Sequence, residues 1–412
     1  MDTPHRQCND CIQFIEDLSS DRGKMQVRET DVVIIGAGSV GSMAAWQLAS
    51  RGVGVVALDR FSIPGPLSAY AGESRLFRKV YKEGGHYTPL LQRSQELWRE
   101  LEAEGGAELL AMTGGVTIAG EDHPDLEALV DASESYDLKH DILDGDAART
   151  RFPGHNILDT DTVFFDPEAG YLRSERAVVT ALKLAAAKGA TFLGNRKALA
   201  VEPQRDRWIV RTDREAVVAQ KVIVSAGTGA SAVTRALGTH LALRPQILTW
   251  FPMARQNAYS APDSPIFIRR SKDAEFYGFP SADGWTVKVA ASVYLDEVES
   301  MERPPSWDPA HLETIRRWVG TYLPDLIPDP VRTQLCADGY MVDSTGLLGE
   351  IPGMPGTVAA VGFSGHGFKM ASAFGAVAAD LAISGATSTD VAFMSPARFL
   401  DESQTLNTLP LA

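Results

Sequence analysis

Short, fully apolar runs rich in β-branched residues recur along the chain, and small-residue turns follow several of them. These runs cover residues 32–35, 55–58, 222–224 and 357–361. Their length and composition are typical of parallel strands that are buried on both faces. Helical spacing of apolar residues occurs at 42–51, 90–104, 174–188 and 370–384. The pattern predicts a parallel sheet covered by helices and assembled from separate stretches of the chain.

A second pattern occupies the middle of the chain. Between about residues 241 and 293, apolar and polar positions alternate and aromatic residues are frequent. The strands predicted there cover residues 247–251, 266–269, 276–279 and 285–291, and a helix is predicted at 307–323. Alternation of this kind is typical of an antiparallel sheet with one covered face. We therefore expect an α/β (α+β) protein in which a Rossmann-like domain is joined to an antiparallel-sheet domain.

The first apolar run leads directly into the turn Gly36-Ala37-Gly38-Ser39-Val40-Gly41. Gly36 permits a tight turn, Gly38 lets the backbone approach a pyrophosphate, and Gly41 lets the helix pack closely on the strand. The helix N-terminus offers N–H groups and partial positive charge to phosphates. Asp59 ends the second run, where its carboxylate can accept hydrogen bonds from ribose hydroxyls and would repel a 2′-phosphate. The unit predicts dinucleotide binding, disfavours NADP, and by itself does not distinguish FAD from NAD.

Charge and cysteine content narrow the class of partner and the compartment. Acidic residues outnumber basic ones by 53 to 39, a net charge of -14 that argues against nucleic acid or an anionic membrane as the main partner. The longest apolar runs are far too short to span a bilayer. Only three cysteines occur, which suggests a reducing, cytoplasmic location without a disulfide framework. Cys8 and Cys11 form a CxxC pair, but no second ligand pair follows to complete a metal site.

Three further motifs carry a resemblance to a known family. They are Gly72-Glu73-Ser74-Arg75-Leu76-Phe77-Arg78, then Tyr277-Gly278-Phe279-Pro280 with Lys288, and Cys336 with Gly362-Phe363-Ser364-Gly365-His366-Gly367-Phe368-Lys369. Together with the glycine-rich turn, they resemble the monomeric sarcosine oxidase and N-methyltryptophan oxidase family. Members of that family are FAD-dependent amine oxidases of the D-amino-acid-oxidase-like fold. The resemblance extends from about residue 30 to residue 399.

The resemblance gives the predicted domains their roles. An N-terminal extension covers residues 1–27, the discontinuous FAD-binding domain covers 28–110, 165–240 and 335–395, and the substrate domain covers 111–164 and 241–334. The residues expected to contact FAD are Gly36, Gly38, Ser39, Val40, Gly41, Asp59, Arg60, Ser74, Arg75, Ala226, Gly227, Cys336, Gly365, Gly367, Phe368 and Lys369.

The resemblance also assigns chemistry to the site. Cys336 is expected to form a thioether to the flavin 8α-carbon; read alone, it is a small buried hydrophobe. Arg78 and Lys369 are expected to bind a substrate carboxylate, since one offers a planar fork and the other a point charge. Lys288 is expected near flavin N5, through a water, where a cation favours reduction of oxygen; its alternative is a lysine that reaches solvent.

Three more residues are expected at the flavin or in the pocket. Arg75 should lie over the flavin face, although a lone arginine is ordinarily a surface cation. Tyr277 and His366 are expected to line the pocket or contact the flavin. His366 has the alternative of a structural role in its turn.

Several positions depart from the family pattern. They are Tyr70 and Ala71 in place of two histidines, Ser292 in place of a third, Gly229 in place of a tryptophan, and Asp338 in place of an aromatic residue. Tyr70, Ala71 and Asp338 fall in or near the pocket, so the resemblance does not establish sarcosine as the substrate. Asp338 has two equal interpretations, as a partner for a second cation on a larger substrate or as a solvent-facing residue.

The resulting hypothesis is an FAD-dependent oxidase of a secondary amine or N-substituted amino acid that carries a carboxylate. A hydride equivalent passes to the flavin, oxygen becomes hydrogen peroxide, and the imine hydrolyses. One alternative is a flavin amino-acid dehydrogenase with another electron acceptor, against which Lys288 argues. The other is a catalytically silent flavoprotein subunit or binding module, which would not need Arg75, Lys288, Cys336 and Lys369 together. The expected partners are a small amine and oxygen, and the oligomeric state is left open.

Overall fold

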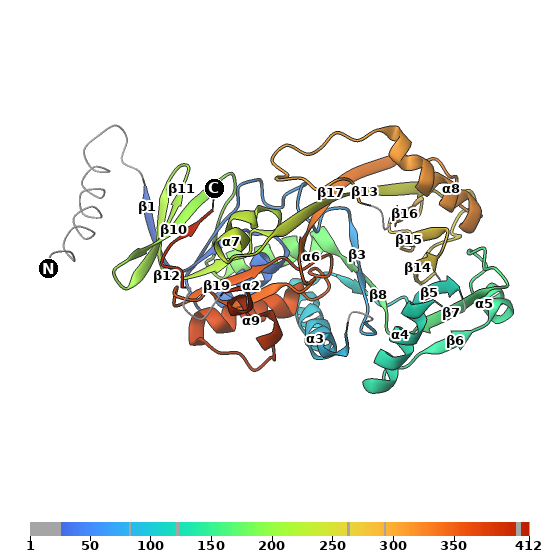
Figure 1. Ribbon diagram of the computed structural model, residues 1–412, viewed down its shortest axis with the longest axis horizontal. Coiled ribbons are helices and arrows are strands. Elements are labelled where there is room, and N and C mark those ends of the chain that lie inside the picture. Colours follow the sequence, from blue (N-terminus) through green and yellow to red (C-terminus); the bar gives the residue numbers. More distant parts are fainter. Residues whose placement is uncertain are drawn as a thin grey trace.

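The computed structural model describes residues 26–81, 84–120, 123–261, 264–291, 294–400 and 405–411. Cys8, Cys11 and Ser292 lie outside these ranges. The described chain forms two large sheets and one small sheet, arranged along the long axis of the molecule (Figure 1). Among the described residues, no helix combines the length and the apolar character that a bilayer crossing requires.

The first large sheet has nine strands and contains the predicted parallel core. Its strands are β1 (Val27–Ile35), β2 (Val55–Leu58), β9 (Thr191–Leu193), β10 (Ala198–Gln204), β11 (Arg207–Thr212), β12 (Ala216–Val224), β18 (Leu347–Glu350), β19 (Thr357–Val361) and β20 (Leu409–Pro410). Strands β19, β12, β1, β2 and β9 pair in parallel, in that order. Val33 and Val32 of β1 pack into different apolar clusters, so both faces of the strand are buried, as its sequence predicts.

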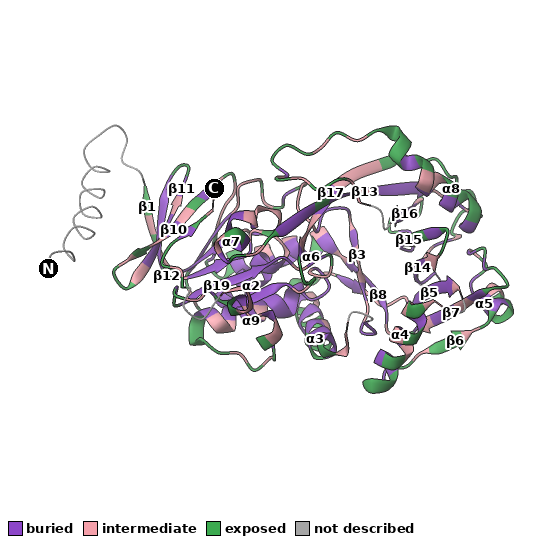
Figure 2. Cartoon of the chain, in the orientation of Figure 1, coloured by how far each residue is buried: buried purple, intermediate pink, exposed green. Residues whose placement is uncertain are grey.

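Helices cover this sheet where the apolar spacing predicts them. They are α2 (Ser39–Ser50), α3 (Thr88–Gly105), α6 (Ser174–Ala187) and α9 (Ala371–Ser384), and the short α7 (Ser231–Ala236) follows β12. Helix α2 packs against α6 and α9. A Cβ at Gly375 of α9 would lie 2.7 Å from the backbone nitrogen of Ala44, so a glycine lets α9 approach α2 closely. Most residues of α2 and α9 are buried (Figure 2), as are residues 32–35 in the second half of β1.

The second large sheet has eight strands in the order β17-β13-β16-β15-β14-β5-β7-β6. Their bounds are β5 (Gly115–Gly120), β6 (Asp141–Leu143), β7 (Asp161–Asp166), β13 (Leu241–Pro252), β14 (Ile266–Ser271), β15 (Ala274–Gly278), β16 (Thr286–Ala291) and β17 (Arg332–Met341). Every pair is antiparallel except β14 with β5, which is parallel. A small sheet of β3 (Ser74–Phe77), β8 (Gly170–Arg173) and β4 (Leu110–Ala111) completes the described strands.

Two segments differ from the expected boundaries. The predicted helix at 307–323 is divided into a 3₁₀ turn, Pro309–Leu312, and α8 (Glu313–Tyr322), because Asp308 caps the chain ahead of Pro309. Strand β17 pairs along its length with β13, so residues from 335 onward join the second sheet by hydrogen bonding although they were assigned to the FAD-binding domain. The remaining helices of the described chain are α4 (Pro124–Ser135) and α5 (Gly145–Arg151), which lie by the second sheet (Figure 1).

Candidate active site

The glycine-rich turn has the geometry that a phosphate cradle requires. Gly36 has a φ of 99°, and a Cβ there would overlap the carbonyl group of Ser225. A Cβ at Gly41 would overlap the carbonyl oxygen of Gly36. Helix α2 begins within the turn, at Ser39 and Val40, so its free N–H groups face the turn. The residues present therefore fit a pyrophosphate, and larger residues at Gly36 or Gly41 would push apart the backbone segments that form the turn.

Asp59 follows the last residue of β2 and lies beside the glycine-rich turn. Its carboxylate accepts hydrogen bonds from the backbone N–H groups of Ala37, at 3.1 Å, and Phe61, at 3.0 Å. Burial raises the pKa of Asp59, while those N–H groups lower it. The neighbouring Arg60 lies against Gly229, where a Cβ would stand 3.3 Å from the guanidinium carbon. The glycine that replaces a family tryptophan thus leaves room for Arg60.

One face of the second sheet gathers four of the residues singled out in the sequence. Directly opposed residues on paired strands point to the same side. Lys288 opposes Trp250, Tyr277 opposes Ala290, Cys336 opposes Gln246 and Asp338 opposes Arg244. The β13 residues in these pairs are Trp250, Gln246 and Arg244, and Leu248 between them opposes Ala290. Alternate residues of a strand point to the same side, so all of these positions share one side of the sheet.

Lys288 is buried, with 3% of its surface exposed. Its Nζ donates hydrogen bonds to the carbonyl oxygens of Gly72, at 2.7 Å, and Ser74, at 2.8 Å. It also lies 4.9 Å from the centre of the Phe279 ring. Burial, followed by the charge of Arg75, lowers the pKa of Lys288 well below its usual value. The side chain therefore does not reach solvent, which excludes the alternative interpretation of this lysine.

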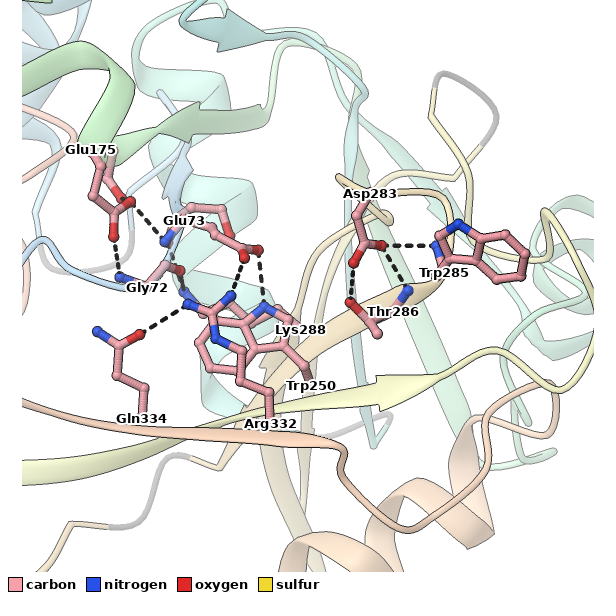
Figure 3. Close-up of polar contacts among 12 residues, drawn as sticks. Gly72, Glu73, Glu175, Trp250, Asp283, Trp285, Thr286, Lys288, Arg332 and Gln334 are labelled. Carbon is pink, nitrogen blue, oxygen red and sulfur yellow. Dashed lines mark hydrogen bonds and ion pairs between the residues drawn. The ribbon is translucent and has the colours of Figure 1, made fainter. Parts of the chain in front are cut away.

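The turn that holds Lys288 is itself fixed by two carboxylates (Figure 3). Glu175, at the start of α6, accepts the backbone N–H groups of Gly72 at 2.6 Å and Glu73 at 2.8 Å. The Glu73 side chain accepts the indole N–H of Trp250 at 2.9 Å and pairs with Arg332. Gly72 and Glu73 have positive φ values of 103° and 69°, a backbone conformation that few residues other than glycine adopt readily.

Arg75 is anchored beside this turn, and its charge acts on Cys336. Its guanidinium donates to the carbonyl oxygens of Ser74 at 2.7 Å, Ala69 at 2.6 Å and Ala71 at 2.6 Å. Cys336 is 2% exposed, and burial raises its pKa to about 11, although the charges of Arg75 and Lys288 lower it. Two cations thus favour the thiolate at a position where burial opposes it.

The C-terminal turn is anchored to α3. The indole N–H of Trp98 donates to the carbonyl oxygen of Lys369 at 3.0 Å, and the Trp98 ring stacks on Phe368 at 5.7 Å. Lys369 Nζ lies 4.6 Å above the ring of Tyr81, against which His366 also packs. The glycines of this turn, Gly365 and Gly367, adjoin Tyr340 and Phe363, and the Ala226–Gly227 turn lies beside Gly36.

Other predicted residues lie elsewhere in the region. Arg78 lines a small cavity together with Asp166, and burial raises the pKa of Asp166 to about 6 while Arg78 lowers it. The pairing of Arg78 with Lys369 stays a prediction. Tyr70 stands where the family has a histidine. Its hydroxyl accepts the backbone N–H of Gly65 at 3.0 Å, and its ring lies beside Gly38 in the glycine-rich turn.

Sequence reasoning missed the residues that support Lys288. Glu175, Trp250 and Arg332 have no recognisable local motif, and Arg332 is 259 positions from its partner Glu73. Asp166 was also missed, since an aspartate at a strand end has no distinctive spacing. A buried lysine on an apolar strand was the one available signal, because such a charge requires partners.

Comparisons with known proteins agree with this arrangement. The model of the FAD-dependent oxidoreductase family matches residues 31–381. Monomeric sarcosine oxidase of Bacillus sp. (strain B-0618) is 30% identical over 370 residues, which cover 89% of this chain and 95% of that protein. N-methyl-L-tryptophan oxidase of Yersinia pestis (strain Pestoides F) is 30% identical over 376 residues, covering 90% and 99%.

Solved structures support the same fold. NikD, an amino acid oxidase essential for nikkomycin biosynthesis, has a TM-score of 0.80 at 23% identity and covers 90% of this chain and 98% of its own. Glycine oxidase from Geobacillus kaustophilus has a TM-score of 0.78 at 17% identity, covering 91% and 100%. The chain therefore belongs to the FAD-dependent oxidoreductase family and is a homologue of monomeric sarcosine oxidase and N-methyl-L-tryptophan oxidase.

Proposed function

We propose that the protein is an FAD-dependent oxidase of N-substituted amino acids, with the flavin attached through Cys336. The observation that carries the proposal is the shared sheet face that holds both Cys336 and Lys288, where the charges of Lys288 and Arg75 lower the pKa of Cys336. We expect one edge of the isoalloxazine ring to lie at this sulfur, and the two cations to lie beside the ring. A protein that only bound a dinucleotide would not need a buried lysine at this place.

Each group has a defined task in this proposal. FAD, when bound, supplies the acceptor for a hydride equivalent from the carbon next to the substrate nitrogen. Lys369 and Arg78 hold the substrate carboxylate, and the amine loses one proton as the imine forms. Lys288 Nζ, fixed by two carbonyl oxygens, supplies positive charge where oxygen is reduced, which stabilises an anion in a buried site. Oxygen takes up two electrons and two protons to give hydrogen peroxide, and water hydrolyses the imine to a carbonyl compound and an amine.

Acid precipitation tests the covalent link. The wild-type holoenzyme should give a yellow pellet, and Cys336→Ala should release its flavin and give a colourless one. Cys11→Ala, which removes a cysteine of the N-terminal extension, is the matched control and should stay yellow. A colourless wild-type pellet would remove the thioether from the proposal.

The electron acceptor is tested separately. A panel of N-methyl and cyclic amino acids should bleach the flavin in the absence of oxygen and yield one peroxide per amine in air. Turnover with an artificial dye but negligible peroxide in air would instead support the dehydrogenase alternative. Failure of every amine to bleach the flavin would support a silent flavoprotein.

A further inference from the structure

Arg78 and Asp166 are the two charged residues that line a small cavity beside the second sheet. The other lining residues come from β5, β7, β14, α4 and the segments that follow β3 and β7, and none of them is ionisable. Asp166 is the last residue of β7 and is 4% exposed. The cavity therefore brings one cation and one anion together in mainly apolar surroundings that are shielded from water.

Each of these two side chains has a buried polar atom without a hydrogen-bond partner among the described residues. The two atoms are Oδ2 of Asp166 and Nε of Arg78. The other carboxylate oxygen of Asp166, Oδ1, accepts the backbone N–H of Glu168 at 2.8 Å. A buried carboxylate oxygen without a donor is costly unless a nearby cation offsets its charge. Arg78 is itself only partly buried, so part of its guanidinium remains accessible to a ligand.

The charges around Asp166 show which neighbour controls its ionisation. Burial raises the pKa of Asp166 to about 6, while the backbone N–H of Glu168 and the charge of Arg78 lower it. The carboxylate of Glu168 raises this pKa, and the ammonium of Lys79 lowers it. Lys79 Nζ is paired with Glu168 at 2.9 Å, so these two charges oppose each other at Asp166. Arg78 is therefore the charge whose loss would drive Asp166 to its neutral form.

We propose that Asp166 is the counter-ion of Arg78 in the free enzyme, and that a substrate carboxylate takes over this guanidinium, so that Asp166 accepts a proton from solution as the substrate binds. Asp166 is then a positioning residue, because it acts on the substrate through Arg78. The two carboxylates compete for one cation, and a buried carboxylate that has lost its cation is neutralised by a proton. This inference rests on the proposed function, since it concerns the arginine assigned there to the substrate carboxylate.

Binding of methoxyacetate to the holoenzyme tests this coupling, read from the perturbation of the flavin absorbance between about pH 5.5 and about pH 8.5. The ligand has no amine, and its carboxylate stays ionised over this range. Because the pKa of Asp166 should be higher in the complex, affinity should be greatest at low pH and fall as the pH rises through about 6. Loss of a nearby opposite charge predicts a fall of about tenfold to a hundredfold across the range. Near neutral pH, an indicator dye in weakly buffered solution should report proton uptake on binding.

Asp166→Asn removes the titrating group and keeps the shape of the side chain. This variant should bind methoxyacetate without proton uptake, should lose the fall in affinity with pH, and should bind more tightly than wild type at about pH 8. A merely structural defect would weaken binding instead. Glu127→Gln, at an exposed position of α4, is the matched control and should behave as wild type does.

Three results would overturn the role of Asp166: the same pH profile in wild type and Asp166→Asn, weaker binding by this variant at about pH 8, or no binding of methoxyacetate at any pH. The proposed function fails on different evidence. If no amine is oxidised but proton uptake is found, the coupling of Asp166 to Arg78 stands and the oxidase proposal fails. If amines yield peroxide while methoxyacetate binds without proton uptake, only the role of Asp166 is removed.

Discussion

Replacing Glu175 with alanine tests whether the turn at Gly72 is held from the side of α6. The carboxylate accepts two backbone N–H groups, at 2.6 and 2.8 Å, and no other described side chain accepts from them. Hydrogen bonds to a charged group contribute about 1.5–3 kcal/mol each. Because Glu175 is half-buried, water can replace part of this, and we expect a loss of about 2–4 kcal/mol in the free energy of unfolding.

Removing Glu175 should also affect Lys288, because the same turn holds the lysine through its carbonyl oxygens. The carbonyl oxygens of Gly72 and Ser74 fix the Nζ of Lys288, and the negative charge of Glu175 raises the pKa of Lys288 against the effect of burial. Removing Glu175 should therefore leave Lys288 both less ordered and less often charged. We expect the reoxidation of reduced enzyme by oxygen to slow more than anaerobic reduction by substrate.

Urea denaturation and stopped-flow oxidation measure the two effects on the same preparations. Glu175→Gln retains one acceptor and should lie between alanine and wild type in both measurements. Glu96→Ala removes an exposed carboxylate on α3 that pairs with Arg93, and should change stability by less than about 1 kcal/mol. An alanine variant at position 175 as stable as the Glu96 control would refute the reasoning. So would equal slowing of both half-reactions.

Three further predictions concern single buried positions. Gly72→Ala should destabilise the protein and disturb Lys288, because its φ is 103° and a Cβ would stand 2.5 Å from Leu248 Cδ1; denaturation midpoints and oxygen kinetics measure this. Lys288→Met should slow reoxidation strongly while stability is retained or increased, because a desolvated ammonium is replaced by an apolar chain; a variant that reoxidises normally would contradict its role. Burial lowers the pKa of His155 to about 3, so the folded state stays neutral while the unfolded state takes up a proton below about pH 6.5. Stability should fall by about 1.4 kcal/mol per pH unit below that point, and His155→Phe should flatten this part of the urea profile against pH.

Local sequence patterns were sufficient for the parts of the fold that local forces determine. The strand at 357–361 and the helix at 370–384 match β19 and α9 to within one residue, because short apolar runs and small-residue helices are recognised without knowledge of their partners. The glycine-rich turn was equally predictable from the sequence, since Gly36 needs a positive φ that other residues rarely adopt.

The candidate site was predictable as a set of residue types but not as an arrangement. The sequence gives no measure of strand register, and a shift of one residue in β17 would move Cys336 to the opposite face of the sheet. The contact between Glu73 and Arg332 joins the turn ahead of β3, in the small sheet, to the first residue of β17, in the second large sheet, and no local spacing encodes it. Likewise, no local spacing shows that Arg78 shares a small cavity with Asp166, and its pairing with Lys369 stays a prediction.

The register of β17 places Cys336, expected to hold the flavin, and Asp338, expected to contact the substrate, at independent positions of one strand. Its ladder to β13 is made by backbone groups, so a substitution at Asp338 leaves the position of Cys336 unchanged. Asp338 nevertheless faces the same space, because it is two residues away on the same side of the strand. A family aromatic residue can therefore be exchanged for a carboxylate without displacing the sulfur or the lysine. Asp338→Leu should therefore leave a yellow pellet on acid precipitation while it changes the ranking of amines by kcat/KM, and a colourless pellet would contradict this separation.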